Sequence, residues 1–269
     1  CALPILKIKL PDSVPPMVSS SFESLIPVII TLVLVCSINY CFTLTSFGNI
    51  HALVNEIIQK PLLLIGTGLP ALLISQGLAQ LLWFFGLHGD QIVGSVMDPI
   101  LQTAGMENLS AYTAGDAVPY IITDQFRALF VMIAFMSLVI AILIVSKSNR
   151  LKGVGKVAVL PATFCISEPV VFGAPVVMNA MLFIPWVLSR PVFGLITWLF
   201  MKFGLCPYPT GVAIPWTTPP VLSGFLATNS IMGAVVQIIC LAIGVLMFIP
   251  FVKMIDKTYH QEEIKTKEQ

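Results

Sequence analysis

Glu168 is the residue whose type and setting most favour chemistry. It lies in the stretch FCISEPVVFGAP (164–175) and is the only acid between Asp124 and Asp256. An ionised side chain at bilayer depth costs about 2.5–3.5 kcal/mol on insertion scales, so such groups are usually functional. The prolines and glycine that follow break a helix, and broken backbone at this depth is tolerated where it lines a cavity. We interpret Glu168 as a binding group at a broken helix, with a structural ion pair as the alternative.

His88 is the second candidate, in the stretch WFFGLHGDQIVGSVMDP (83–99). Gly86 and Gly89 flank it and allow a tight turn with close backbone approach. A neutral imidazole both donates and accepts a hydrogen bond, which suits a sugar hydroxyl or a proton relay. These residues favour such a function and a simple helix cap equally.

Trp216, in the stretch IPWTTPPVLSG (214–224), is the third candidate. An indole face packs on the apolar face of a pyranose ring, although tryptophan is also common at membrane interfaces. Thr217 beside it offers a hydroxyl, and Asn179 lies in an apolar run where its amide needs a partner. These residue types predict a site for a polar small molecule such as a sugar.

The composition of the chain limits its class. Of 269 residues, 57% are apolar and 10% are charged, whereas an ordinary soluble domain has about 25% charged residues. So few charges cannot cover a soluble domain of this size, which excludes a soluble enzyme, a nucleic-acid-binding protein and a disordered chain. The formal net charge of +1 implies no strongly charged partner.

Sequence motifs for catalysis and cofactor binding are missing. The chain contains no H-E-x-x-H, P-loop, G-x-S-x-G or dinucleotide-binding pattern, and its six cysteines form no C-x-x-C pair. Cysteines placed in this way are typical small apolar residues rather than disulfide partners or metal ligands. We predict no catalytic residue, no metal site and no cofactor.

Apolar runs predict the fold class. A helix that crosses the ~30 Å hydrocarbon core needs about 20 apolar residues. Four runs meet this requirement, and a fifth is interrupted by Pro185 and the pair Arg190-Pro191, so it is expected to form a kinked span or two pieces. We predict an all-α polytopic membrane protein with about five transmembrane helices. The predicted spans are 25–47, 61–86, 126–146, 176–203 and 229–252.

The segments between these spans can shape a site. Residues 157–175 are too short and broken to cross the membrane and are expected to form a re-entrant hairpin. Residues 204–228 carry five prolines and are expected to be extended or re-entrant. Residues 87–125 hold five acids in a mixed sequence, and they leave open whether a further crossing or hairpin lies there.

The two ends of the chain are more polar than its middle. Residues 1–24 are expected to form an amphipathic interfacial helix as a lead-in, 25–252 a transmembrane domain for substrate binding and transport, and 253–269 a cytoplasmic tail. Basic residues cluster at 147–156 and in the tail, and their preference for the cytoplasmic side places both clusters there. The chain begins at Cys1 without a signal-peptide pattern, which favours a part of a longer polypeptide.

Three stretches of the sequence resemble one membrane-protein family. They are LLWFFGLHGDQIVGSVMDPI (81–100), LPATFCISEPVVFGAPVVMNAMLFIPWVL (160–188) and PWTTPPVLSGFLATN (215–229). They are similar to enzyme IIC, the membrane component of the bacterial phosphotransferase system (PTS), in the subgroup for cellobiose, diacetylchitobiose and lactose. The stretch KIKLPDSVPPMVSSSFESLIP (7–27) resembles the amphipathic segment in the middle of that component, so the chain resembles its C-terminal part.

This resemblance implies a function and a role for each matched residue. Family members bind a disaccharide from outside, carry it across the membrane and present it for phosphorylation by a cysteine of a soluble subunit, enzyme IIB. The membrane component is not phosphorylated, so no phosphocysteine is expected on this chain. The residues matched by Glu168 and His88 bind sugar hydroxyls, and the one matched by Trp216 packs on a sugar ring. A homodimer of the full-length protein and a place in the bacterial cytoplasmic (inner) membrane are implied as well.

Two departures from the family pattern concern the site. Where relatives have Asn-Ile-Asn-Glu-Pro, this sequence has Cys-Ile-Ser-Glu-Pro (165–169), and Ser167 can replace only part of the bonding of an amide. Where relatives have a glycine-rich turn, this sequence has IAFMSLVIA (133–141), which is expected to form a continuous helix.

Two other functions remain open at this point. The first is an ion-coupled secondary sugar transporter, in which Glu168 and His88 relay protons. The second is a truncated IIC remnant that does not transport. Uptake that survives loss of the soluble phosphotransferase proteins but stops with an uncoupler would favour the ion-coupled transporter.

Overall fold

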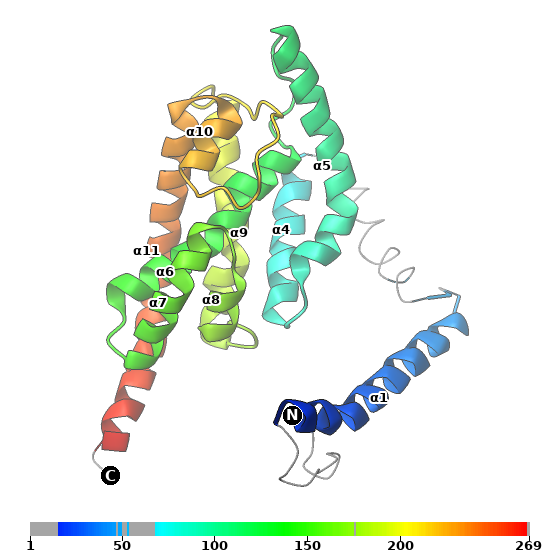
Figure 1. The fold of residues 1–269 in the computed structure, drawn as a ribbon. Coiled ribbons are helices and arrows are strands. Elements are labelled where there is room, and N and C mark those ends of the chain that lie inside the picture. The colour runs from blue at the N-terminus through cyan, green and yellow to red at the C-terminus, as the bar shows by residue number, and fades with distance from the viewer. Residues whose placement is uncertain (1–15, 47, 50–52, 54–67, 175, 268–269) are drawn as a thin grey trace. The chain divides into compact units, whose positions relative to one another are not determined.

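The structure is a computed structural model that describes residues 16–46, 48–49, 53, 68–174 and 176–267. The chain divides into two compact units, residues 1–61 and 62–269. Every regular element in the described ranges is a helix (Figure 1). This confirms the all-α fold class.

The first unit contains the helix α1 (Pro16–Thr43). Its residues Leu25–Thr43 are long and apolar enough to cross a membrane, with a mean hydropathy of 2.3. Most of the predicted first span, 25–47, therefore lies in α1. This helix begins at Pro16, within the segment 1–24 that was predicted as a lead-in to the span. The part of the lead-in before Pro16 lies outside the described residues.

The second unit contains the remaining helices (Figure 1). Its described part begins at residue 68, so the first residues of the span predicted at 61–86 lie outside it. The elements are α4 (Leu69–Phe84), α5 (Gly89–Ala114), the π-helical turn η3 (Phe126–Val131), the 3-10 turn η4 (Met132–Ala134), α6 (Phe135–Val145), α7 (Asn149–Thr163), α8 (Glu168–Gly173), α9 (Ala180–Lys202), α10 (Leu222–Thr228) and α11 (Ile231–Lys267).

Helix length and hydropathy support a multi-pass membrane protein. Among the described residues, four helices are long and apolar enough to span a bilayer: Leu25–Thr43, Phe126–Val145, Ala180–Lys202 and Ile231–Lys265. Helix α4 is also apolar but has only 16 residues in its described form. The predicted spans at 25–47, 126–146, 176–203 and 229–252 each fall on one of these helices.

Proline does not divide the span predicted at 176–203. Most of this segment forms one helix, α9 (Ala180–Lys202), which continues through Pro185 and Pro191 and packs against α4 and α11. The alternative of two pieces is therefore wrong, and a kink in this span stays a prediction. The stretch 133–141 lies in one uninterrupted helical segment, Phe126–Val145, as predicted. Within this segment the backbone changes from the π-helical turn η3 to the 3-10 turn η4 and then to α6.

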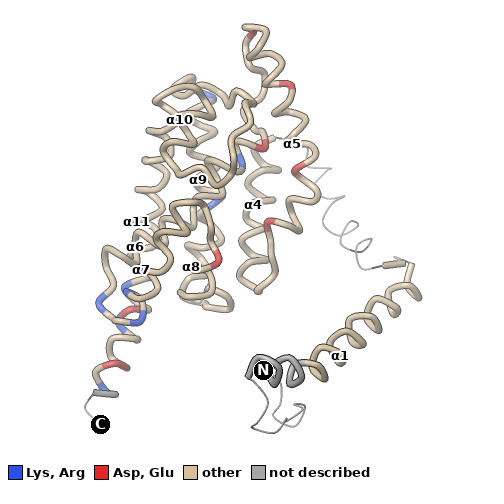
Figure 2. Tube along the Cα trace, viewed as in Figure 1, with Lys and Arg blue, Asp and Glu red and all other residues tan. Residues whose placement is uncertain are grey.

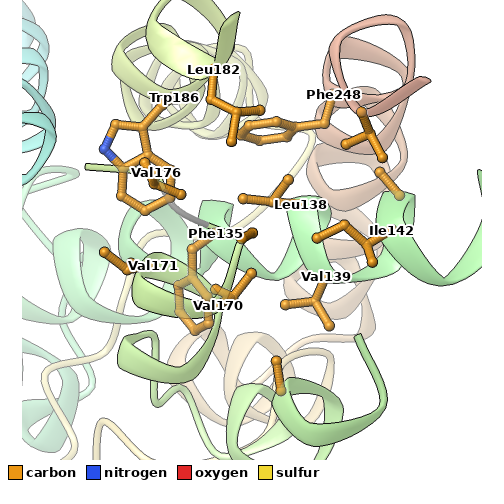
Figure 3. Close-up of a cluster of buried hydrophobic side chains, with 14 of the residues drawn as sticks. Phe135, Leu138, Val139, Ile142, Val170, Val171, Val176, Leu182, Trp186 and Phe248 are labelled. Atoms are coloured by element: carbon orange, nitrogen blue, oxygen red, sulfur yellow. The ribbon is translucent and has the colours of Figure 1, made fainter. Parts of the chain in front are cut away.

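The hydrophobic core fixes the short helix that carries Glu168. Figure 3 shows α8 side chains packed against α6, with α9 and α11 closing the cluster. Since this cluster is fully buried, α8 has little freedom to rotate, and the position of its first residue is set by packing. The labelled members are Phe135, Leu138, Val139 and Ile142 of α6, Val170 and Val171 of α8, Val176 between α8 and α9, Leu182 and Trp186 of α9, and Phe248 of α11.

The two basic clusters meet at one end of the second unit (Figure 2). The Asp256 carboxylate of α11 accepts hydrogen bonds from the backbone N–H groups of Lys147 (2.7 Å) and Ser148 (2.9 Å). About two turns further along α11, Glu263 accepts a hydrogen bond from the backbone N–H of Arg150 at 3.0 Å. The tail helix therefore caps the start of α7, and the prediction that both clusters lie on the same side is supported.

Candidate functional site

A cavity of about 570 Å³ lies in the second unit between the segments that carry the predicted residues. Its lining includes His88, Ser167, Glu168 and Trp216, which come from three separate parts of the chain. The lining is rich in charge for an apolar protein, because it also contains Asp90, Asp98, Asp124, Arg127 and Arg190.

Glu168 is the first residue of α8 and follows a tight turn. Cys165 in that turn has a left-handed backbone (φ 63°), where the chain passes from α7 to α8, and the two helices contact each other. The re-entrant course predicted for 157–175 stays a prediction. The Glu168 side chain is exposed, and within the described ranges it has no hydrogen-bond or ion-pair partner. The structure therefore does not pair this carboxylate with a Lys or Arg, and leaves it available to a ligand.

His88 lies in the turn between α4 and α5. The turn depends on Gly89, because a Cβ atom there would lie 1.9 Å from the backbone oxygen of Ala79. The His88 Nδ1 accepts a hydrogen bond from the backbone N–H of Gln91 at 3.3 Å and so caps α5. Since Nδ1 is the acceptor, the imidazole proton is assigned to Nε2, which is left to donate to a ligand.

Trp216 stands at the rim of the cavity, and its side chain is 57% exposed. It belongs to the irregular segment that follows α9, which has no regular element before Leu222. The prediction of extended chain for 204–228 therefore fits residues 204–221, whereas 222–228 form the helix α10. The Cys165 thiol approaches the Thr218 carbonyl oxygen (3.6 Å between Sγ and O), which links this segment to the turn before Glu168.

Two predicted site residues lie away from the cavity. Asn179 caps α9, with its side-chain oxygen accepting from the backbone N–H of Met181 at 3.1 Å. Thr217 is half-buried next to Trp216 and is not part of the cavity lining. The structure therefore brings together four of the six predicted residues.

A buried ion pair between Arg190 and Asp90 forms part of the cavity wall that also contains His88. Arg190 of α9 donates two hydrogen bonds to Asp90 of α5, one of them 3.0 Å from Nη2 to Oδ2. Trp83 donates from its indole nitrogen to the same Oδ2 at 2.9 Å. Burial raises the pKa of the Asp90 carboxyl, but the charge and hydrogen bonds of Arg190 outweigh burial and lower that pKa to about 2. Asp90 is therefore ionised at neutral pH.

These ion pairs were missed by the sequence analysis. Arg190 was interpreted only as part of a helix break, and the acids of 87–125 were left without roles. A second pair joins Asp98 to Arg127 on the same cavity. The signal was present, since Arg190 is the only basic residue between Lys156 and Lys202, and the rule that selected Glu168 applies to it as well.

A buried glutamine holds the π-helical turn that lines the cavity. Gln237 of α11 donates from Nε2 to the Leu129 carbonyl oxygen (2.8 Å) and to the Ser223 hydroxyl (2.9 Å). Its Oε1 accepts from the backbone N–H groups of Val221 and Gly224. One side chain thus ties η3 to the start of α10, and π-helical turns often occur at functional sites.

A second cavity, of about 760 Å³, lies elsewhere in the second unit. Trp198, Lys202 and Glu107 are among its lining residues, but none of the predicted site residues is. Across the described part of the chain, no group of three or more His, Cys, Asp or Glu side chains is arranged to hold a metal ion. The smaller cavity is therefore the candidate site.

Comparisons with known proteins give one consistent result. A family model described as "Phosphotransferase system, EIIC" matches residues 3–189. The chain is 46% identical over 257 residues to the "PTS system oligo-beta-mannoside-specific EIIC component" of Bacillus subtilis (strain 168), which covers 94% of this chain and 58% of that protein. It is 39% identical over 263 residues to the "PTS system cellobiose-specific EIIC component" of Geobacillus stearothermophilus, covering 95% of this chain and 58% of that protein.

A solved structure agrees with these relatives. The structure described as the transporter ChbC, the IIC component from the N,N'-diacetylchitobiose-specific phosphotransferase system, matches with a TM-score of 0.73 at 37% identity. The match covers 96% of this chain and 61% of that chain. The chain thus spans about three fifths of the length of the relatives it matches.

Proposed function

The chain belongs to the EIIC family of the phosphotransferase system, and from this we propose that it forms the sugar-binding part of a permease for a β-linked disaccharide. The sugar binds in the cavity that contains Glu168 and His88, crosses the membrane, and is phosphorylated on the cytoplasmic side by a IIB subunit. The observation that carries the proposal is the unpaired Glu168 carboxylate in the same cavity as the Nε2–H group of His88 and the indole of Trp216.

The cavity suits a disaccharide in size and chemistry. Its volume of about 570 Å³ lies within the roughly 300–1,000 Å³ common for small-molecule sites. Each sugar hydroxyl that enters must exchange water for a protein partner, and one left unpaired costs about 1–3 kcal/mol. Glu168 accepts hydrogen bonds as a charged group, which makes them stronger than neutral ones. We assign Glu168 and His88 to hydroxyls near the phosphorylated position, and Trp216 to a sugar ring.

The charge of the cavity favours release after phosphorylation. Asp90 and Asp98 each engage one arginine, so the arginines are not free to bind an added phosphate. Glu168 and Asp124 also face the cavity, and carboxylates repel a phosphate dianion in surroundings of low dielectric constant. A phosphorylated sugar therefore binds this site more weakly than the free sugar.

Three partners follow from this assignment. One is a IIB subunit with a phosphocysteine; the relatives include a lactose-specific EIICB component of Staphylococcus aureus. The second is the lipid bilayer of the bacterial cytoplasmic membrane. The third is a second copy of the full-length protein, as a homodimer. Of the six proposed sugar-site residues, Glu168, His88, Trp216 and Ser167 line the cavity. Asn179 caps α9, and Thr217 is next to Trp216 but is not part of the cavity lining.

Uptake of radiolabelled cellobiose, lactose and diacetylchitobiose by bacterial cells tests the function. We expect uptake that requires the soluble IIB subunit, survives an uncoupler of the proton gradient and delivers the sugar as its phosphate. The same cells without IIB are the matched control. Uptake that persists without IIB and stops with the uncoupler would instead identify an ion-coupled transporter. A folded protein that supports no uptake would identify a remnant without transport activity.

A further inference from the structure

A continuous series of contacts connects helix α9 to the cavity histidine. It begins at Arg190, whose side chain is 2% exposed and which donates two hydrogen bonds to Asp90. Asp90 accepts the indole N–H of Trp83 at 2.9 Å. The Trp83 ring lies 4.4 Å from the His88 ring, between centroids, at an interplanar angle of 47°.

The first contacts in this series hold the Trp83 ring, and His88 at the end of the series packs against that ring. The guanidinium fork of Arg190 holds both oxygens of Asp90, which fixes the plane of the carboxylate. That plane sets the direction of the Trp83 N–H, and Trp83 is itself buried. His88 is exposed, and among the described residues it contacts the Trp83 ring and accepts a 3.3 Å hydrogen bond from the backbone N–H of Gln91.

We propose that Arg190 is a positioning residue for sugar binding: through Asp90 and Trp83 it fixes the ring orientation in which His88 presents its Nε2–H to a sugar hydroxyl. This inference rests on the proposed function for its ligand. Sugar recognition depends on short, directed hydrogen bonds, so an imidazole that rotates freely binds more weakly than one held in place. An ion pair with a purely structural role would affect only the stability of the contact between α5 and α9.

The orientation of His88 can be measured without any sugar. The chain contains three histidines, so 13C/15N-histidine labelling of the full chain in detergent gives few ring signals, and His88→Gln identifies the one that belongs to His88. The Trp83 ring current displaces that signal from its free-histidine position. The variants are Arg190→Lys, which keeps the charge but loses the fork, and Trp83→Phe, which leaves the ion pair intact.

The matched control is Ser189→Ala, next to Arg190 on α9. The Ser189 hydroxyl is fully buried, donates to the Trp186 carbonyl oxygen (2.8 Å) and lies 3.3 Å from the Gln80 amide nitrogen, but it is not part of the cavity lining. This variant therefore disturbs the packing of α4 against α9 without breaking the series that ends at His88.

We expect Arg190→Lys and Trp83→Phe to move the His88 signal toward its free-histidine position and to raise the Kd for radiolabelled cellobiose about tenfold, whereas Ser189→Ala changes neither. An unchanged His88 signal in Arg190→Lys would overturn the inference, as would an equal loss of affinity in Ser189→Ala. If the unmodified protein binds no sugar, the proposed function fails, and the His88 signals still decide whether Arg190 orients the ring. If Arg190→Lys does not fold, the test uses Trp83→Phe, in which the ion pair between Arg190 and Asp90 is intact.

Discussion

Replacing Glu168 by glutamine is expected to weaken sugar uptake strongly without weakening the fold. Glutamine keeps the shape of the side chain but removes the charge that strengthens its hydrogen bonds to a sugar. The expected loss is about 1.5–3 kcal/mol of binding free energy, or roughly 10- to 100-fold in Kd. Stability is expected to stay the same because the Glu168 side chain is exposed and unpaired among the described residues. Uptake of radiolabelled disaccharide and the thermal unfolding midpoint in detergent measure the two effects.

The control for this variant is Asp116→Asn, which removes the charge of an exposed acid between α5 and η3. It is not part of the cavity lining, and uptake by this variant is expected to be normal. Normal uptake by Glu168→Gln would contradict the assignment of the site. A large fall in its unfolding midpoint would contradict the view that Glu168 serves a ligand instead of the fold.

Replacing Gly89 by alanine is expected to damage both the fold and the site. The added Cβ would lie 1.9 Å from the Ala79 carbonyl oxygen, a backbone atom that cannot move without shifting α4. Forcing atoms into a packed interior costs about 1–3 kcal/mol, and the rigid neighbour puts this variant at the upper end of that range. His88 is the adjacent residue, so separation of α4 from α5 also moves the imidazole out of the cavity wall.

Gly153→Ala is the matched control for Gly89→Ala. Gly153 lies inside α7, and a Cβ there would meet nothing within 4 Å. Alanine in a helix interior is favoured over glycine by about 1 kcal/mol, so this variant is expected to raise the unfolding midpoint slightly and leave sugar binding unchanged. Equal behaviour of the two variants in thermal unfolding would show that the approach of α4 and α5 is less tight than the structure has it.

Hydropathy predicted most of the fold because the chain is built from apolar helices. The runs at 126–146 and 229–252 each contain about 20 residues with few charges, and both form helices long enough to span a bilayer. Helix α5 was not predicted, since its acids and low mean hydropathy hide a 26-residue helix from a search for apolar runs. Of the two alternatives predicted for 176–203, two separate pieces is wrong, since α9 continues through both prolines and packs against α4 and α11.

The candidate site was only partly predictable from sequence. Glu168 stood out because it is a charged residue in an apolar stretch, and His88 stood out because two glycines flank it. The fold places both residues on one cavity. The contacts of Arg190 with Asp90 join residues 100 positions apart, and no local pattern reveals such a pair. Asn179 caps α9 in the structure, and a lone amide in apolar sequence serves a helix cap as readily as a ligand, so its role at a sugar site stays a prediction.

Equilibrium binding of a disaccharide panel to the detergent-purified protein tests the central claim most directly. The panel contains radiolabelled cellobiose, lactose, diacetylchitobiose and a β-mannoside, with the α-linked maltose as the negative control. We predict saturable binding of at least one β-linked sugar, weakened at least tenfold by Glu168→Gln and absent for maltose. A folded protein that binds none of these sugars, or binds them equally well with and without the Glu168 carboxylate, would contradict the account.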